Sequence, residues 1–507
     1  MSTDLPDGEE SADRIRRRHR KTASNHISRQ KRRVYIGGEW VESQGREMFK
    51  THDPTTGHVL AEIQACSAAD VDRAVEVAWE AYHDHWADST VTERQELLHA
   101  IADRIEAKKE EFAVIDTLDN GKPITESRAD IDLCIDQFRY FAGAIRVHEG
   151  RVVPNAVDQH IQTVHEPYGV VGQIVPWNFP MLMASWKLAP ALATGNTTVI
   201  KPAEQTPLSM LELVREIEDV VPDGVVNVVT GYGPEAGAPI VSHDDIPKVA
   251  FTGSTEVGQG VMKRAARGVT DITLELGGKS PVVVYPDVDI DEAVDVATRA
   301  MFFNNGETCS AGTRLFVHED IETAFVEAFV ENAEQLTLGD PLDEETDLGP
   351  QVNPSQANKT MQYVESLRED GASVLTGGYE PSDGPLANGC FVAPTVVTDV
   401  DHDARGAQEE IFGPVEVVFT WDDYDEMIRL ANDVEYGLAA GIITDDLDNA
   451  HEAASDLEAG NIWVNTYNTF PAGQPFGGVK QSGNGREVAA ETLAEYTQTK
   501  TIAIGFD

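Results

Sequence analysis

The segment KVAFTGSTEVGQGVMKRAARG, residues Lys248–Gly268, decides the fold class that we predict for this chain. It begins with a short apolar run, turns at Gly253 and continues as a helical pattern. Four further apolar runs of the parallel-strand type are GVVGQIVPW, TTVIKPA, GVVNVVTG and PVVVYPD. Because helical patterns separate these runs, the βαβ alternation predicts a doubly wound α/β sheet.

Three stretches outside this segment have clear helical periodicity. Residues 67–86 have an acid-rich first turn, and residues 90–123 form one long pattern that stops at Asn120 and Gly121. In residues 207–221 we expect Thr206 to cap the helix and Pro207 to occupy its first position, where a missing N–H costs nothing.

A second α/β unit begins near Gly278, with a helix over residues 287–306 and the strand TRLFVHED after it. Two strand-like segments, Val152–Pro167 and the C-terminal YTQTKTIAIGFD, lack a following helix. They are expected to pair as a β-arm that extends a sheet across a subunit interface, because exposed strand edges invite pairing. The predicted division is 34–150 with 169–277, then 278–485, with 151–168 and 486–507 as the arm.

The charge of the chain is extreme, with 87 acidic against 39 basic residues among 507 and a net charge of −48. The acidic residues are scattered, which favours a halophilic surface that concentrated salt must screen, over an ordinary acidic protein. Such a charge disfavours nucleic acid as a partner. Residues 1–33 are the exception, with ten basic residues between Arg14 and Arg33. We expect a disordered basic tail, the alternative being an arm that contacts the acidic body.

The remaining composition indicates a cytoplasmic protein. No run of 18 apolar residues suggests a membrane span, and the N-terminus lacks the apolar segment of a secretory signal. The four cysteines form no CxxC pair, which argues against disulfides and against a metal site.

One of these cysteines, Cys309, is a candidate nucleophile. It lies in FFNNGETCSAGTR, where small and polar neighbours let the backbone approach a ligand, and a thiolate is the reactive form of cysteine. The alternative is a buried core cysteine, and we keep that interpretation for Cys66, Cys134 and Cys390.

Glu275 is a candidate base. It ends an apolar strand in TLELGGKSPVVV, at the kind of strand-to-loop position where active sites of open α/β sheets collect. Partial burial would raise the pKa of this carboxyl group and make it a usable base. The alternative is a surface glutamate in an acidic protein.

Polar residues near the next strands suit anion and nucleotide binding. Asn178, fixed between Pro176 and Pro180, could donate to an oxyanion, the alternative being a turn asparagine. Lys201 and Glu204 suit a ribose, and the glutamate would repel a 2′-phosphate, unless the two form only a solvated ion pair. The turn at Gly253 could hold a pyrophosphate at its helix start. The glycine-rich loops EEIFGPV and PFGGVKQSGNGRE could line a pocket.

Taken together, these motifs closely resemble the NAD(P)-dependent aldehyde dehydrogenase superfamily. The resemblance runs from about Val34 to Asp507 and rests on PWNFP, KPAEQTPLS, FTGSTEVG, LELGGKSP, NNGETCSAGTR and EEIFGPV, all in family order. It implies a dinucleotide-binding domain (34–150 and 169–277), a catalytic domain (278–485), the β-arm and a homodimer or homotetramer.

The resemblance also implies roles for single residues. Cys309 would be the nucleophile, Glu275 the general base and Asn178 the oxyanion donor, with Glu487 as a second carboxylate that relays protons. The residues implied to hold the cofactor are Trp177, Lys201, Glu204, Gly253, Ser254, Thr255, Glu256, Val257, Gly258, Glu410 and Phe412. The cofactor is then expected to be NAD rather than NADP, because of Glu204.

By the same resemblance, the entry tunnel for an aldehyde substrate would be apolar and aromatic. Its implied lining is Phe179, Met183, Trp186, Phe303, Phe470 and Phe476. This favours aliphatic or aromatic aldehydes, oxidised through a thioester that water hydrolyses, and leaves betaine aldehyde open because aromatic groups hold quaternary ammonium. A semialdehyde dehydrogenase, an acylating enzyme that uses coenzyme A, and a non-catalytic protein that kept the fold are also left open.

Overall fold

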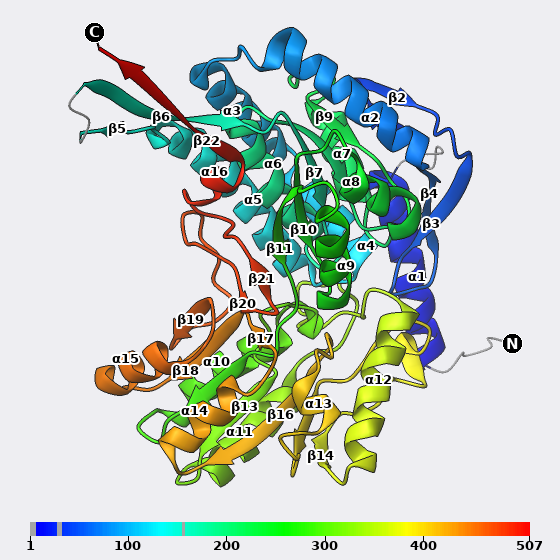
Figure 1. Cartoon of the computed structure of the whole chain (residues 1–507). Helices are drawn as coiled ribbons and strands as arrows, with labels where there is room; N and C mark the ends of the chain where they lie inside the picture. Colours follow the sequence, from blue (N-terminus) through cyan, green and yellow to red (C-terminus); the bar gives the residue numbers. More distant parts are fainter. Residues whose placement is uncertain (1–6, 28–32, 155–157, 507) are drawn as a thin grey trace, which may run out of the picture.

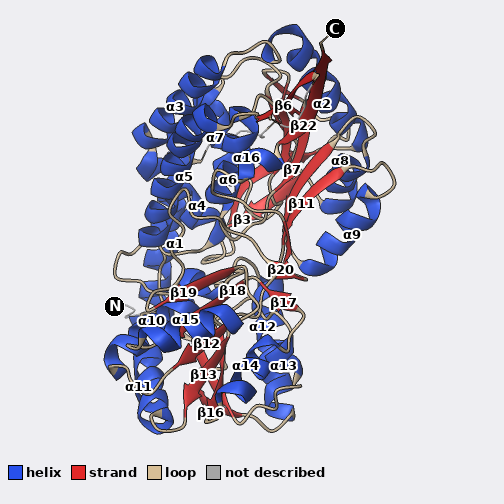
Figure 2. Ribbon diagram, turned by 60° about the vertical axis from the view of Figure 1, so that its left-hand side comes forward, coloured by secondary structure: helices blue, strands red, loops and turns tan. Residues whose placement is uncertain are grey.

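The computed structural model describes residues 7–27, 33–154 and 158–506. Two sheet-containing units lie one above the other in Figure 1, and a three-stranded arm projects from the upper one. Figure 2 shows that helices flank the strands of both units. The alternation of strands and helices along the chain confirms the predicted α/β class.

The first sheet has the order β2-β1-β9-β8-β7-β10-β11-β21. Its five central strands, from β9 to β11, run parallel, and β1 and β21 add antiparallel edges. The strands are β1 (Val34–Ile36), β2 (Glu39–Val41), β7 (Val170–Ile174), β8 (Thr197–Lys201), β9 (Val226–Val228), β10 (Lys248–Thr252), β11 (Asp271–Glu275) and β21 (Gly483–Asn484). The helices of this unit are α2 (Ala68–Ala81), α3 (Val91–Ala107), α4 (Lys109–Asn120), α5 (Ile124–Ala144), α6 (Pro180–Ala193), α7 (Leu208–Ile217), α8 (Ala238–Ser242) and α9 (Thr255–Ala265).

The second sheet has the order β14-β15-β16-β13-β12-β18-β19, parallel except at β14. Its strands are β12 (Pro281–Val284), β13 (Arg314–His318), β14 (Ser373–Thr376), β15 (Thr395–Thr398), β16 (Val415–Trp421), β18 (Ala439–Ile443) and β19 (Asn461–Val464). The helices of this part of the chain are α10 (Ile290–Phe302), α11 (Glu322–Gln335), α12 (Pro354–Glu369), α13 (Arg405–Gln408), α14 (Tyr424–Asn432), α15 (Leu447–Asp456) and α16 (Thr492–Glu495). The chain changes sheets between β11 and β12. It returns at β21, which the predicted division assigned to the second unit.

The five apolar runs form β7, β8, β9, β10 and β12, as predicted. Two helix details differ from the prediction. The long pattern over residues 90–123 is two helices that meet at Lys108, whose backbone leaves the helical region, and the second ends at the left-handed Gly121. Pro207 is the cap of α7 rather than its first residue, so Thr206 lies outside the helix.

The two strand-like segments without helices do pair. β22 (Thr497–Gly505) runs antiparallel to β6 (Gln159–Pro167), from Thr497 opposite Pro167 to Gly505 opposite Gln159. The short strand β5 (Val152–Val153) completes this arm on the other edge of β6. Two further antiparallel pairs join β3 (Glu47–His52) to β4 (Val59–Ala65), and β17 (Tyr436–Gly437) to β20 (Val479–Lys480).

The predicted disorder of residues 1–33 is wrong for helix α1 (Asp7–His26), which lies along one side of the molecule in Figure 1. The prediction rested on the charged residues and did not consider His19, which lies inside the basic run. His19 is buried, and its ring bonds to Asp53 Oδ2 through Nδ1 and to Asp340 Oδ1 through Nε2, both at 2.8 Å. Arg18 adds a hydrogen bond to Asp340 at 3.1 Å. Residues 1–6 and 28–32 of the predicted tail lie outside the described residues.

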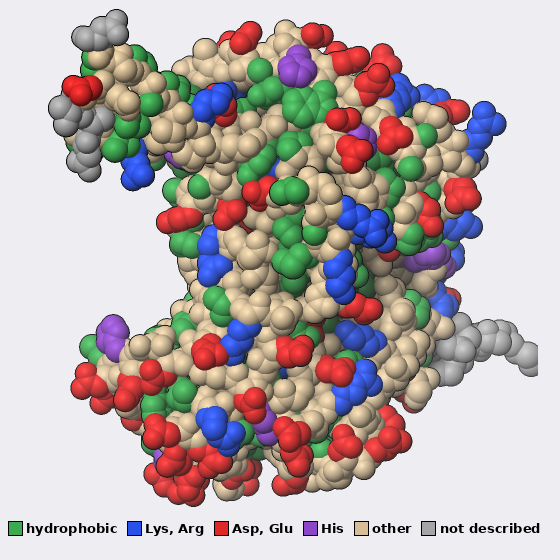
Figure 3. All heavy atoms as spheres, in the orientation of Figure 1, with side chains coloured by type: hydrophobic (Ala, Val, Ile, Leu, Met, Phe, Trp, Pro, Cys, Tyr) green, Lys and Arg blue, Asp and Glu red, His purple; other side chains and the backbone are tan. Residues whose placement is uncertain are grey.

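Across the ranges that the structure describes, none of the helices combines the length and the apolar character needed to cross a membrane. Acidic side chains gather over the visible face of the second unit in Figure 3.

The His19 contacts predict a pH-dependent stability. Burial alone would lower the pKa of His19, but the hydrogen bonds to Asp340 and Asp53 raise it from 6.5 to about 9. The contribution of His19 to the free energy of unfolding is therefore fully present below about pH 6.5 and is lost as the pH rises through about 9. This contribution is on the order of 3 kcal/mol. Urea unfolding between pH 6 and pH 10 should show this decline, and His19→Asn should remove it. An unchanged slope in the variant would contradict the contribution of His19.

Candidate active site

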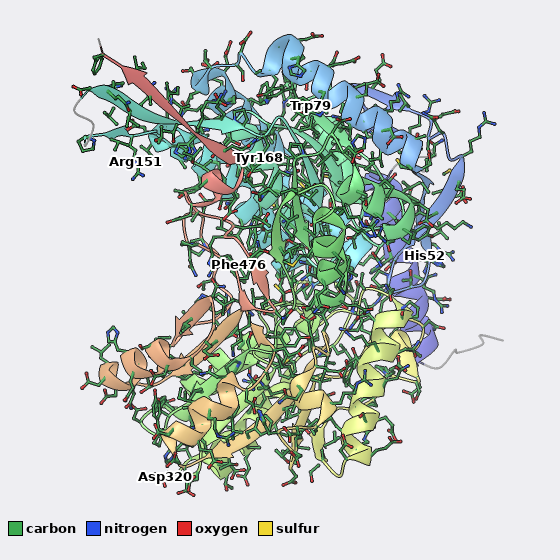
Figure 4. All side chains as sticks on the ribbon, in the orientation of Figure 1. His52, Trp79, Arg151, Tyr168, Asp320 and Phe476 are labelled. Atoms are coloured by element: carbon green, nitrogen blue, oxygen red, sulfur yellow. The ribbon has the colours of Figure 1, made fainter. Side chains whose placement is uncertain are left out.

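One cavity lies where the two units meet, with a volume of about 950 Å³ including its open mouth. Figure 4 labels Phe476, one of its lining residues, at this junction. The predicted site residues that line it are Trp177, Asn178, Phe179, Met183, Trp186, Gly253, Ser254, Glu275, Cys309, Glu410, Phe412, Phe470 and Phe476. The predicted site residues that do not line it are Lys201, Glu204, Thr255, Glu256, Val257, Gly258, Phe303 and Glu487.

A sharp bend in the chain presents Cys309 to the cavity. The bend follows α10 and consists of three consecutive left-handed residues, Asn304 (φ 51°), Asn305 (φ 58°) and Gly306 (φ 70°). Asparagine and glycine are the residues that tolerate this conformation best, so the letters NNG suit the bend. Gly306 also leaves no room for a side chain, because a Cβ there would lie 2.6 Å from the Gly413 carbonyl carbon.

The surroundings of Cys309 disfavour the thiolate form of its side chain. Burial raises the pKa of Cys309, and the carboxylates of Glu410 and Glu275 raise it further, although the N–H groups of Ser310 and Cys309 act in the opposite direction. The resting group is therefore a thiol, and a nearby base must take its proton before it can attack a substrate.

Glu275 is the candidate for that base. It is the last residue of β11, is 4% exposed and lines the same cavity as Cys309. Neither carboxylate oxygen has a hydrogen-bond partner in the described structure. Burial, and after it the charge of Glu487, raises the pKa of Glu275 well above its usual value. Only the ionised form of this carboxyl group can accept a proton, and a raised pKa makes that form a stronger base than an exposed glutamate.

Glu487 lies behind Glu275 rather than in the cavity. Its Oε1 pairs with Lys187 Nζ at 2.5 Å, and both side chains are buried. The sequence reasoning missed Lys187. The available signal was a lysine inside the otherwise apolar helix PMLMASWKLAPALA, which forms α6. A buried lysine requires a charged partner, so its position pointed to a carboxylate nearby.

The Asn178 side chain lines the cavity and is held by the loop of Cys309. Its Nδ2 donates to the backbone carbonyl of Glu307 at 3.0 Å. An amide nitrogen carries two N–H groups, so the second can donate to a ligand in the cavity. Asn178 therefore brings an amide donor to the wall of the cavity that Cys309 also lines.

The other end of the cavity suits a nucleotide. The Ser254 hydroxyl caps α9 by accepting the Val257 N–H at 3.4 Å, and the first turn of a helix attracts anions. At the end of β8, Lys201 Nζ lies 3.4 Å from Glu204 Oε2 of the following loop, and burial lowers the pKa of this lysine. The Glu204 side chain is partly exposed beside it, so its carboxylate is open to a ligand.

Glu410 and Phe412 line the cavity from the loop between α13 and β16. The Gly278 N–H donates to Glu410 Oε1 at 3.1 Å, and the ring of Trp177 lies edge-on to Phe412, with 5.1 Å between centroids. Sequence reasoning missed two supports from α12, Gln356 and Lys359, which donate to the Phe412 and Glu410 carbonyls at 2.6 Å and 3.1 Å. No sequence signal distinguished these two from ordinary polar residues on a helix.

An aromatic group borders the opposite end of the cavity. The ring of Phe476 lies 5.3 Å from Trp186 and 5.6 Å from Phe470, measured between centroids. Phe303 is set back from the cavity, and its ring stacks on Phe179 at 5.9 Å. Leu182, which the sequence reasoning omitted, adds to the apolar lining together with Met183.

Comparison with known proteins gives a consistent result. A model of the aldehyde dehydrogenase family matches residues 40–502. Retinaldehyde dehydrogenase 3 of Rattus norvegicus is 45% identical over 480 residues, which is 94% of this chain and 93% of the relative. The NAD⁺ complex of an aldehyde dehydrogenase from Bacillus cereus is 44% identical with a TM-score of 0.92, covering 94% and 97% of the two chains. Betaine aldehyde dehydrogenase from Staphylococcus aureus, solved with NAD⁺, is 38% identical with a TM-score of 0.94, covering 96% and 98%.

The raised pKa of Cys309 predicts slow alkylation at neutral pH. The rate of iodoacetamide labelling, followed at the Cys309 peptide by mass spectrometry, should still be rising above pH 9, whereas an ordinary thiol of pKa about 8.5 levels off there. Glu275→Gln should shift the curve to lower pH, since it removes a negative charge near the sulfur. A plateau near pH 7 in the wild-type protein would contradict a raised pKa at Cys309.

Proposed function

The chain belongs to the aldehyde dehydrogenase family, and from this premise we propose that it oxidises an aldehyde to a carboxylic acid with NAD and water. The observation that carries the proposal is the meeting of three groups in one cavity. These are the thiol of Cys309, the side-chain amide of Asn178 and the unpartnered carboxylate of Glu275.

The residues around the cavity fit a dinucleotide. The start of α9 at Ser254 would take the pyrophosphate, Lys201 and Glu204 would contact the adenosine ribose, and Glu410 would contact the nicotinamide ribose. Close packing supports this fit, because a Cβ at Gly277 would lie 2.4 Å from the Glu410 carboxylate, and a side chain there would displace it. When bound, NAD supplies the acceptor for the hydride that leaves the substrate carbon.

The chain's own groups perform the remaining chemistry. Glu275 takes the proton from Cys309, and the sulfur forms a bond to the aldehyde carbon while the carbonyl electron pair moves to oxygen. The Asn178 amide and the Cys309 N–H stabilise that oxyanion, and losing one such donor costs about 2.7–4 kcal/mol. Loss of hydride from the same carbon leaves a thioester on Cys309.

Hydrolysis of the thioester uses the same carboxylate a second time. Glu275 takes a proton from water, the hydroxide adds to the thioester carbon, and the carbon–sulfur bond breaks to release the carboxylic acid. Lys187 and Glu487 lie behind Glu275 and offer a route by which its proton could leave, because they form a buried, hydrogen-bonded pair.

The lining of the cavity favours an aliphatic or aromatic aldehyde. Among its described residues there is no arginine to bind the second carboxylate of a semialdehyde acid. Betaine aldehyde is the second candidate, since Trp186, Phe470 and Phe476 could hold a quaternary ammonium group. An acylating reaction with coenzyme A is disfavoured, because Glu275 is present to activate water.

Three properties of the whole molecule belong to the same proposal. The β-arm of β5, β6 and β22 supports a homodimer or homotetramer, because such an arm leaves strand edges for a partner. The net charge of −48 supports a halophilic protein, and the cysteine pattern supports a cytoplasmic one. Activity assays are therefore best run in molar potassium chloride.

The reaction is tested by following NADH formation over a panel of aliphatic, aromatic, semialdehyde and betaine aldehydes. We expect activity with the first two classes, product acid without coenzyme A, and loss of activity in Cys309→Ser. Cys390→Ser is the matched control, because Cys390 lies outside the cavity and should leave the rate unchanged. Absence of NADH formation with every aldehyde, or full activity in Cys309→Ser, would refute the proposal.

Cofactor choice is tested at Glu204. Its carboxylate should repel the 2′-phosphate of NADP, so Glu204→Ser should lower the KM for NADP while weakening NAD binding. Equal KM values for the two cofactors in the wild-type enzyme would contradict this role. Glu235→Ser, on an exposed residue after β9, provides a charge-matched control.

A further inference from the structure

Three hydrogen bonds around Asn304 connect the two halves of the oxyanion site. The Asn304 Nδ2 donates to the backbone carbonyl of Asn178 at 3.0 Å and to that of Glu307 at 3.1 Å. The same Glu307 carbonyl accepts the side-chain amide of Asn178 at 3.0 Å. All three residues are buried, so these bonds are shielded from water.

We propose that Asn304 is a positioning residue that sets the distance between the two oxyanion donors, the Asn178 amide and the Cys309 N–H. This inference rests on the proposed function. The Asn304 side-chain nitrogen donates to the backbone carbonyl of Asn178, which carries the first donor. It also donates to the backbone carbonyl of Glu307, two residues before Cys309, which carries the second donor. Because the amide is planar and its two N–H groups have a fixed angle, the two backbones are held at one separation.

Asn304 is itself held in place by groups that do not touch a substrate. Its backbone N–H donates to Glu126 Oε2 at 3.0 Å, from α5, and its left-handed backbone turns the side chain back toward Asn178. The Asn304 Oδ1 has no partner in the described structure. The side chain therefore serves as a donor only, and aspartate, which has no N–H, cannot replace it.

The next residue is a natural control. Asn305 is also buried and left-handed, and its side chain also makes two backbone hydrogen bonds. Its Nδ2 donates to the Pro350 carbonyl at 3.1 Å, and its Oδ1 accepts the Gly349 N–H at 2.7 Å. These bonds anchor the loop to a different segment, so a loss of Asn305 weakens the loop without freeing Asn178.

The first experiment compares Asn304→Gly with Asn305→Gly in the full-length enzyme. Glycine adopts the left-handed backbone without steric strain, and both variants add the same flexibility to the unfolded chain, so a difference between them reports the lost side-chain bonds. Both should lower the melting temperature. Only Asn304→Gly should slow NADH formation in a single turnover at saturating NAD, by about tenfold or more, since a displacement of 1 Å costs about 100-fold. Asn304→Asp, which keeps the volume, should slow it similarly and serves if the glycine variant does not fold.

The second experiment separates positioning from general loosening. In an Asn178→Ala background the donor is gone, so changing Asn304 should slow the single turnover far less than in the wild type. Equal slowing in both backgrounds, or equal slowing by Asn304→Gly and Asn305→Gly, would overturn the inference.

A cofactor-free readout distinguishes this inference from the proposed oxidation. Hydrolysis of 4-nitrophenyl acetate forms a comparable oxyanion on Cys309 without hydride transfer, and it should show the same dependence on Asn304 and Asn178. If ester hydrolysis depends on Asn304 but no NADH forms, the proposed oxidation is contradicted and the positioning role of Asn304 is supported. If NADH formation and ester hydrolysis both occur and neither changes when Asn304 is replaced, the positioning role is contradicted and the proposed oxidation is supported.

Discussion

The hydrogen bond from the Asn178 side chain to the Glu307 carbonyl joins the two units where their chemical groups meet. Glu275 ends a strand of the first sheet, and Cys309 precedes a strand of the second. Neither sheet alone can set the distance between a base and a nucleophile that belong to different sheets. Loops of the two units must therefore be tied to each other, and the bond between Asn178 and Glu307 ties the loop after β7 to the loop that carries Cys309, inside a buried region.

Burial then determines the electrostatics of the site. Two carboxylates, Glu275 and Glu487, share the neighbourhood of one buried cation, Lys187. Lys187 is hydrogen-bonded to Glu487, and Glu275 has no hydrogen-bond partner in the described structure. Burial, and after it the charge of Glu487, raises the pKa of Glu275, although the Lys187 cation acts in the opposite direction. The same burial disfavours a thiolate at Cys309. The thiol and the carboxyl group that line this cavity therefore both favour their protonated forms, so the proposed reaction requires a proton to leave Glu275 before this group can act as a base.

The sequence predicted those features that depend on residues close together in the chain. The apolar runs indicated the parallel strands, the letters NNG suited a tight turn before Cys309, and Glu275 was placed correctly at a strand end. Features that depend on contacts between distant segments could not be predicted this way. Lys187 and Glu487 are 300 residues apart. Gln356 and Lys359 of α12 line the cavity, and they donate to the backbone carbonyls of Phe412 and Glu410, about 50 residues further along the chain. The break at Lys108 was hidden because both helices continue the same apolar periodicity.

Helix α1 shows why charge alone is a poor guide to disorder. Arginine is the most frequent residue in this helix, yet the buried contact is made by His19, which lies between two aspartates, while Arg18 donates to one of them. Asp53 follows β3 and Asp340 follows α11, so one imidazole ring bridges segments that lie far apart in the chain. The helix precedes residue 40, where the match to the family begins. In so acidic a protein, a cation on a docking helix finds carboxylates on both sides of the junction, and the apolar side chains of Ala12, Ala23 and Ile27 add to the contact.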